Sequence, residues 1–131
     1  MSDRHTRIHS GAPWEPLAGY CRAVRAGNIV AVSGSAAVDE NGELVGEGDI
    51  HAQSVQCLKV LEAALENAGS GLADVVRTRM FVTDISQWEA VAKAHRAFFG
   101  DAPPATSMVE VSALIDPRML VEIEADAVIP D

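Results

Sequence analysis

Residues 119–129 constrain the fold more than any other part of the sequence, because apolar and acidic residues alternate along them. A period of two predicts a strand with one buried face. The apolar face holds Val121, Ile123, Ala125, Ala127 and Ile129. The opposite face holds Leu120, Glu122, Glu124 and Asp126. A solvated acidic face is the simpler interpretation; the alternative is that one acid lies in a cleft between subunits.

Two amphipathic segments predict helices. Asp49 begins the first by offering an acceptor to free N–H groups, and Gly69 ends it. Ser86 and Glu89 form the pattern of a capping box before the second, which Gly100 ends. The two apolar stripes are Ile50, Val55, Leu58, Leu61 and Leu65, and Trp88, Val91, His95, Phe98 and Phe99.

The remaining strands are expected at about 20–26, 29–36, 75–83 and 106–111, with a short one at 44–45. Each helix then lies between two strands, and right-handed crossovers place both helices on one face of the sheet. The sequence therefore predicts one α+β domain over residues 1–131, with residues 1–14 as a frayed, flexible arm. The uncovered face must be solvated or buried by another subunit.

Charge and cysteine content argue against several classes of function. The net charge is −9, and the ten Lys and Arg residues are scattered instead of forming the basic patch of a nucleic-acid binder. Cys21 and Cys57 make neither a disulfide framework nor a zinc motif, so no metal is expected. No apolar run reaches about 20 residues, and residues 1–10 lack a signal-peptide core. A cytoplasmic protein that binds no membrane is expected.

Five short motifs, in this order and spacing, resemble those of the Rid (reactive intermediate deaminase, YjgF-like) family. None is specific by itself, but together they cover about residues 15–129. They are the strand end Val32–Gly34, the strand exit Phe81–Asp84, the helix end Ala97–Phe99, the segment Pro104–Val111 and the segment Val121–Ala125.

The resemblance implies a chorismate-mutase-like fold, in which a mixed sheet carries two helices on one face and three subunits pack around a central barrel. It also implies a homotrimer whose active sites are clefts between subunits. The expected activity is hydrolysis of reactive enamines or imines, such as 2-aminoacrylate, to keto acids and ammonia. The expected partner is a small-molecule metabolite, and no cofactor or metal is implied.

The resemblance also assigns site residues. Glu122 matches the acid that positions water, Tyr20 the cleft tyrosine and Ser33 the strand-end serine, while Met108 falls in the substrate-binding segment. Thr106 stands where the family has an arginine that clamps a substrate carboxylate. Threonine offers one neutral hydroxyl and cannot replace a charged, two-pronged donor. This departure puts 2-aminoacrylate deamination in doubt.

Other residues are weaker candidates. His95 lies on an apolar helix stripe, where a histidine is more often a satisfied core residue than a catalyst. Arg22, Arg79 and Arg118 could supply the missing positive charge, and Arg118 is the preferred one because it precedes the strand of Glu122.

Two functions remain open on the sequence, and it favours the first. One is a Rid-like hydrolase acting on an imine, an enamine or a related small molecule. The other is a trimeric binding or regulatory protein that kept the cleft without the catalysis. RNA cleavage, a third activity attached to the family, is opposed by the acidic composition.

Overall fold

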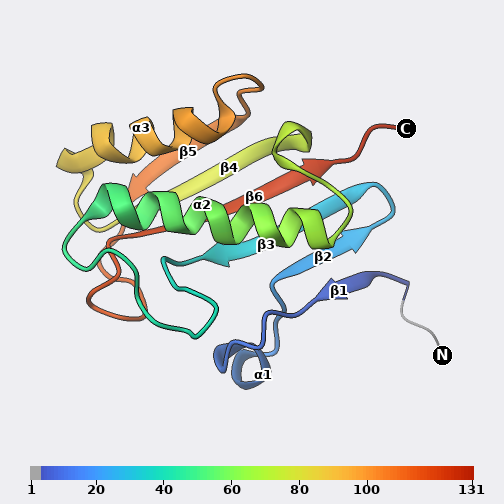
Figure 1. Cartoon of the computed structure of the whole chain (residues 1–131), viewed down its shortest axis with the longest axis horizontal. Helices are drawn as coiled ribbons and strands as arrows, with labels where there is room; N and C mark the ends of the chain where they lie inside the picture. Colours follow the sequence, from blue (N-terminus) through green and yellow to red (C-terminus); the bar gives the residue numbers. More distant parts are fainter. Residues whose placement is uncertain (1–3) are drawn as a thin grey trace.

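The computed structural model describes residues 4–131 and consists of one mixed sheet with two long helices against one of its faces (Figure 1). The sheet has six strands in the order β1-β2-β3-β6-β4-β5. The elements are β1 Thr6–Ile8, α1 Trp14–Ala18, β2 Ala23–Ala26, β3 Ile29–Ser35, α2 Ile50–Asn67, the 3₁₀ turn η1 Leu72–Asp74, β4 Val75–Val82, the 3₁₀ turn η2 Ile85–Gln87, α3 Trp88–Phe99, β5 Ala105–Glu110 and β6 Val121–Val128.

Strand β6 lies inside the sheet, antiparallel to both β3 and β4. Its side chains alternate as its sequence predicts: Val121, Ile123, Ala125 and Ala127 are buried, and the acids between them are half-buried. The parallel pair β4–β5 is joined through α3, as a parallel connection requires. The predicted mixed sheet with two helices on one face is therefore confirmed.

The core lies between this face and helices α2 and α3. Leu58, Leu61 and Leu65 of α2 have no exposed surface and pack with the apolar side of β6. Burying one such side chain contributes about 1.5–3 kcal/mol. Asp49 caps α2 as expected, because its carboxylate accepts a hydrogen bond from the Ala52 N–H at 3.1 Å.

Within residues 4–131 no helix lies across the other face of the sheet, and polar side chains gather there. The Arg79 guanidinium lies 3.0 Å from the Asp126 carboxylate and 3.6 Å from that of Glu124. These side chains are partly exposed, so their ion pairs add little stability. We call this side the open face.

The N-terminal segment differs from its prediction. Residues 1–3 of the expected arm lie outside the described part of the chain, but Thr6–Ile8 form β1 and pair antiparallel with Arg25–Ala23 of β2. The chain then turns through α1, which ends at Gly19 with φ 77°. The prediction of a frayed arm is therefore wrong for these residues. Their polar side chains give no strand pattern in the sequence, but their backbone groups form hydrogen bonds to β2.

Three local predictions also fail. The first predicted strand begins at Ala23, not at Tyr20. The short strand at 44–45 is only a single bridge between Leu44 and Val38. Ser86 does not cap α3: its hydroxyl donates to the Asp84 carboxylate at 2.6 Å, which makes a turn before the helix begins at Trp88.

No helix within residues 4–131 combines the length and the apolar character needed to cross a membrane.

Candidate functional site

The centre of the candidate site is a bulge in β3. Between Val32 and Ser35 the strand advances three residues while its partner β6 advances two, from Ala125 to Ile123. An extra residue of this kind re-aims nearby side chains. A Cβ attached at Gly34 would lie 2.5 Å from Oε2 of Glu122. The absent side chain of Gly34 is therefore what makes room for this carboxylate.

Glu122 is half-buried on the open face of β6. Burial raises the pKa of its carboxyl group above the usual value, the nearby Arg22 guanidinium opposes that rise, and Glu124 adds to it. A carboxyl with a raised pKa holds a proton closer to neutrality and suits acid–base work. The surroundings of Glu122 thus favour its protonated form more than water does.

Arg22 is the cation of this site and was only a secondary candidate in the sequence. It is 9 % exposed, and its Nη2 donates a 2.5 Å hydrogen bond to the Gly34 carbonyl. Its Cζ lies 6.0 Å from the centre of the Tyr20 ring, a cation–π distance. The resulting cluster joins Tyr20, Arg22, Gly34 and Glu122.

Ser33 and Tyr20 lie where this cluster meets a cavity. The Ser33 hydroxyl donates to the Cys21 carbonyl at 2.7 Å, and its N–H donates to the Arg22 carbonyl at 3.0 Å. The serine therefore ties β3 to the chain before β2, and its oxygen can still accept from a ligand. Cys21 is buried, with its thiol 3.4 Å from the Ala23 carbonyl.

The cavity has a volume of about 750 Å³ and lies between the N-terminal segment and strands β2 and β3. This size suits a small-molecule ligand. Its lining is Arg7, His9, Gly11, Ala12, Pro13, Glu15, Pro16, Gly19, Tyr20, Cys21, Val24 and Ser33.

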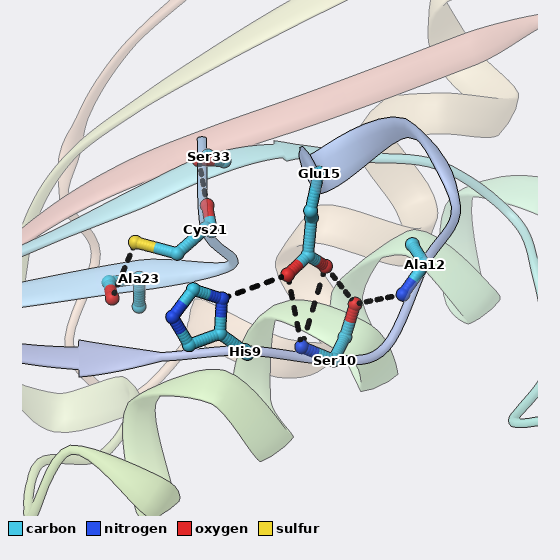
Figure 2. Close-up of polar contacts among 7 residues, drawn as sticks. All are labelled: His9, Ser10, Ala12, Glu15, Cys21, Ala23 and Ser33. Carbon is cyan, nitrogen blue, oxygen red and sulfur yellow. Dashed lines mark hydrogen bonds and ion pairs between the residues drawn. The ribbon is translucent and has the colours of Figure 1, made fainter. Parts of the chain in front are cut away.

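Glu15, which the sequence interpretation missed, holds the wall of this cavity. It is 3 % exposed, accepts from the Ser10 N–H at 3.2 Å and from the Ser10 hydroxyl, and lies 3.4 Å from Nδ1 of His9 (Figure 2). Burial acts to raise the pKa of Glu15, but the bonds from Ser10 and His9 and the charge of Arg22 lower it below the usual value. A signal was available: Glu15 lies between Pro13 and Pro16 in a segment ended by Gly19.

Thr106 and His95 lie on the other side of the sheet from Glu122. The Thr106 hydroxyl donates to the Thr78 carbonyl at 3.3 Å and accepts from the Thr78 hydroxyl at 2.7 Å. The Thr78 hydroxyl is also 2.9 Å from Nε2 of His95. Burial lowers the pKa of His95, which favours the neutral ring. The hydroxyl of Thr106 is thus already bonded within the chain.

Met108 follows Thr106 on the same face and packs against the core. A smaller cavity of about 330 Å³ lies at this edge, between β5 and the end of α3. It is lined by His95, Arg96, Phe99, Gly100, Pro103, Pro104 and Thr106. Within one chain, the predicted substrate-binding residues therefore fall into two groups on opposite faces of the sheet.

Arg118 was the preferred replacement for the missing arginine, and the structure places its guanidinium against Asp116. Nε and Nη2 of Arg118 donate to the two Asp116 carboxylate oxygens at 3.1 and 2.8 Å. These hydrogen bonds hold the pKa of Asp116 at about 2. Two donor groups of the Arg118 guanidinium are therefore already bonded to a neighbour in its own loop.

A search of residues 4–131 finds no group of three or more His, Cys, Asp or Glu side chains placed to hold a metal ion.

Comparison with known proteins shows the family of the chain. The family model described as Endoribonuclease L-PSP matches residues 10–129. The chain belongs to the YjgF/Rid family. It is 38% identical over 120 residues to the 3-aminoacrylate deaminase RutC of Acinetobacter baylyi, covering 92% of this chain and 94% of that one. It is 36% identical over 126 residues to an uncharacterised Streptomyces coelicolor protein, covering 96% and 93% of the two chains.

Solved structures show the same fold. A YjgF/YER057c/UK114 family member from Mycobacterium tuberculosis superposes with a TM-score of 0.88 at 50% identity, covering 95% of this chain and 99% of that one. The YjgF gene product of Escherichia coli superposes with a TM-score of 0.82 at 35% identity, covering 94% and 97%. The family resemblance seen in the motifs is therefore confirmed over nearly the whole chain.

Proposed function

We propose that this YjgF/Rid protein is a cytoplasmic hydrolase that deaminates small enamines or imines, with Glu122 as its acid–base group. The observation that carries the proposal is the Glu122 carboxylate, half-buried with a raised pKa in the space left by Gly34. The similarity to a 3-aminoacrylate deaminase supports the same reaction class.

The reaction asks little of the protein beyond positioning and proton transfer. With 2-aminoacrylate, a protonated Glu122 donates to the terminal carbon and leaves an iminium ion. Water then adds to the iminium carbon and passes a proton back to Glu122, which gives a neutral carbinolamine. The proton of its hydroxyl moves to its nitrogen, the C=O bond forms, and ammonia leaves with the electron pair of the carbon–nitrogen bond. The products are pyruvate and ammonia. A group that acts in this way typically contributes about 10²–10⁴-fold in rate.

A homotrimer around a central barrel, with its sites between subunits, is part of this proposal. Its support is the separation of Glu122 on the open face from Thr106 and Met108 on the helix-covered face. A cleft between subunits allows the edge of one sheet to meet the open face of another. The open face, which no helix covers, is the surface that such packing would bury (Figure 1).

Two other functions have less support. A protein that only binds a metabolite gives no reason to keep a half-buried carboxyl with a raised pKa in the space left by Gly34. Ribonuclease activity, which the description of the family model suggests, is opposed by the net charge of −9. We therefore propose a small-molecule metabolite as the partner, without nucleic acid, membrane or cofactor.

The test is the release of ammonia from freshly generated 2-aminoacrylate and 3-aminoacrylate, followed with a coupled assay. Glu122→Gln should lower kcat about 10²–10⁴-fold. Glu124→Gln is the matched control, because Glu124 lies two residues along the same face and pairs with Arg79. It should keep most of the activity. A wild type that releases no ammonia from either isomer, or equal losses in the two variants, would contradict the proposal.

A further inference from the structure

Arg22 has more hydrogen-bond donors than residues 4–131 offer acceptors for them. A guanidinium carries five N–H groups, and Arg22 uses one, from Nη2 to the Gly34 carbonyl. Its Nε is enclosed and meets no acceptor in residues 4–131, although the residue as a whole is only 9 % exposed. A buried donor without an acceptor is costly, so the position of this guanidinium needs an explanation beyond the stability of the fold.

Neither nearby carboxylate satisfies Arg22. The charge of Arg22 helps to lower the pKa of Glu15, but the oxygens of Glu15 are taken by Ser10 and His9. Glu122 also feels the Arg22 charge, yet no hydrogen bond or ion pair joins the two among the described residues. The guanidinium therefore lies close to the acid–base group without being bonded to it.

Other arginines with described contacts differ in this respect. Arg79 pairs with Asp126 and Glu124, and Arg118 is held by both oxygens of Asp116. Arg25 donates through Nε and Nη1 to the Gly27 and Ala68 carbonyls. Arg22 alone among these four combines deep burial with an Nε that has no acceptor.

The surroundings of Arg22 fit a small anion that has a planar body. The Tyr20 ring lies at cation–π distance from the guanidinium and lines the 750 Å³ cavity, whose wall also includes Ser33. Ser33 is adjacent to Gly34, whose carbonyl orients Arg22. A carboxylate bonded to Arg22 would lie next to Tyr20, which lines the cavity, and near Glu122.

We propose that Arg22 binds the carboxylate of the substrate and of the keto-acid product, and so supplies from β2's end of the sheet the cation that Thr106 cannot supply from β5. This inference rests on the proposed function and names the residue of this chain that would hold the substrate carboxylate. Arg22 is then a substrate-binding residue, and Glu122 remains the group that moves protons.

The most direct test observes the Arg22 Nε–H in the wild-type protein. In an arginine-detected ¹H–¹⁵N spectrum, pyruvate should shift the Arg22 Nε–H resonance in a saturable way, whereas neutral pyruvamide should not. The Nε–H of Arg79, whose Nη1 is already paired with carboxylates, is the internal control and should stay in place. A saturable shift at Arg79 or Arg118 instead of Arg22, or no shift at all, overturns the proposal.

Variants give the energetic test by calorimetry. Arg22→Gln should weaken pyruvate binding at least about tenfold, a change of ~1.4 kcal/mol, and leave pyruvamide binding unchanged. Arg22→Lys, which keeps the charge and loses the fork, should show a smaller loss. Arg79→Gln should bind pyruvate as the wild type does. Equal losses for pyruvate and pyruvamide would mean that Arg22 only supports the fold.

The outcomes separate this inference from the proposed function. Ammonia release by the wild type together with unchanged pyruvate binding in Arg22→Gln overturns the role of Arg22 and leaves the hydrolase standing. Pyruvate binding that depends on Arg22, without hydrolysis of either enamine, supports the role of Arg22 and overturns the hydrolase. Light scattering completes the test: dissociation of Arg22→Gln into smaller species would show that the missing acceptor belongs to another copy of the chain.

Discussion

On the helix-covered face of the sheet, buried polar side chains find their partners within the chain, whereas on the open face Arg22 does not. Gln53 has no exposed surface and uses its amide fully: it donates to the Gly46 and Arg118 carbonyls and accepts from the Leu120 N–H. Thr78 likewise bonds to Thr106 and His95.

This contrast indicates which face of the sheet carries the candidate functional site. A fully satisfied polar group stabilises a single arrangement of the chain, while a buried donor without an acceptor lowers stability and is retained where a ligand or a partner completes it. The helix-covered face therefore determines the fold, and the bulge of the open face is where a ligand would add bonds that the chain lacks.

The largest expected effect is on the helix-covered face. Leu61→Ala leaves a cavity among fully buried side chains and should lower the free energy of unfolding by about 2–5 kcal/mol. Val76→Ala, at a side chain that is 49 % exposed, is the matched truncation and should change it by less than about 0.5 kcal/mol. Urea denaturation measures the free energy of unfolding of both variants. Similar decreases would contradict the expected difference between core and surface positions.

The next effect belongs to the bulge and should appear in activity before stability. Gly34→Ala places a Cβ 2.5 Å from Oε2 of Glu122, so the carboxylate must move. We expect kcat to fall about 10–100-fold, since misplacing a reacting group by an ångström has effects of this order. In a Glu122→Gln background, Gly34→Ala should lower kcat only slightly further. Full additivity of the two losses would show that Gly34 acts elsewhere.

A smaller effect is expected where Thr106 is bonded. Thr78→Val keeps the shape of the side chain and removes the hydroxyl between Thr106 and His95, which should cost about 1–3 kcal/mol of stability. Ser70→Ala, which removes a partly buried hydroxyl bonded to Asp74 at a turn, should cost less. Thermal unfolding compares the two. An unchanged unfolding midpoint for Thr78→Val would mean that the hydrogen bonds of the Thr78 hydroxyl to Thr106 and His95 do not contribute to stability.

The smallest effects are opposite pH dependences of two acids. The pKa of Glu122 is raised on folding, so its ionisation disfavours the native state, and Glu122→Gln should increase stability at pH 7 by an amount that fades below pH ~4.5. The pKa of Glu15 is lowered, so Glu15→Gln should decrease stability at pH 7, and its deficit should fade as the pH falls through the carboxyl range. Denaturation at several pH values measures both, and shifts of the same sign would refute the assignment.

Much of the fold could be predicted because its signals are local. The alternation in β6, the apolar stripe of α2 and its Asp49 cap each depend on residues a few positions apart. The N-terminal segment could not be predicted in this way. Its strand depends on hydrogen bonds to β2, and its buried acid Glu15 depends on His9 and Ser10 folding back over it.

The candidate site divides along the same line. Glu122 could be named from its place in a motif, but its surroundings depend on a one-residue bulge in another strand. The sequence does not distinguish Arg22, Arg79 and Arg118 from one another. Only their neighbours in space distinguish a guanidinium bonded to Asp116 from one with an unbonded Nε beside the acid.

The sequence by itself determined the family and the mixed sheet, and it singled out Glu122 as the candidate acid, because periodicity and short motifs can be recognised along the chain without knowing its fold. The tertiary structure alone decided that Thr106 and Glu122 lie on opposite faces, that Thr106 is bonded internally and that Arg22 stands beside Glu122. The physical reason is that these outcomes depend on strand register and on which donors meet which acceptors, and both arise from pairing between distant segments.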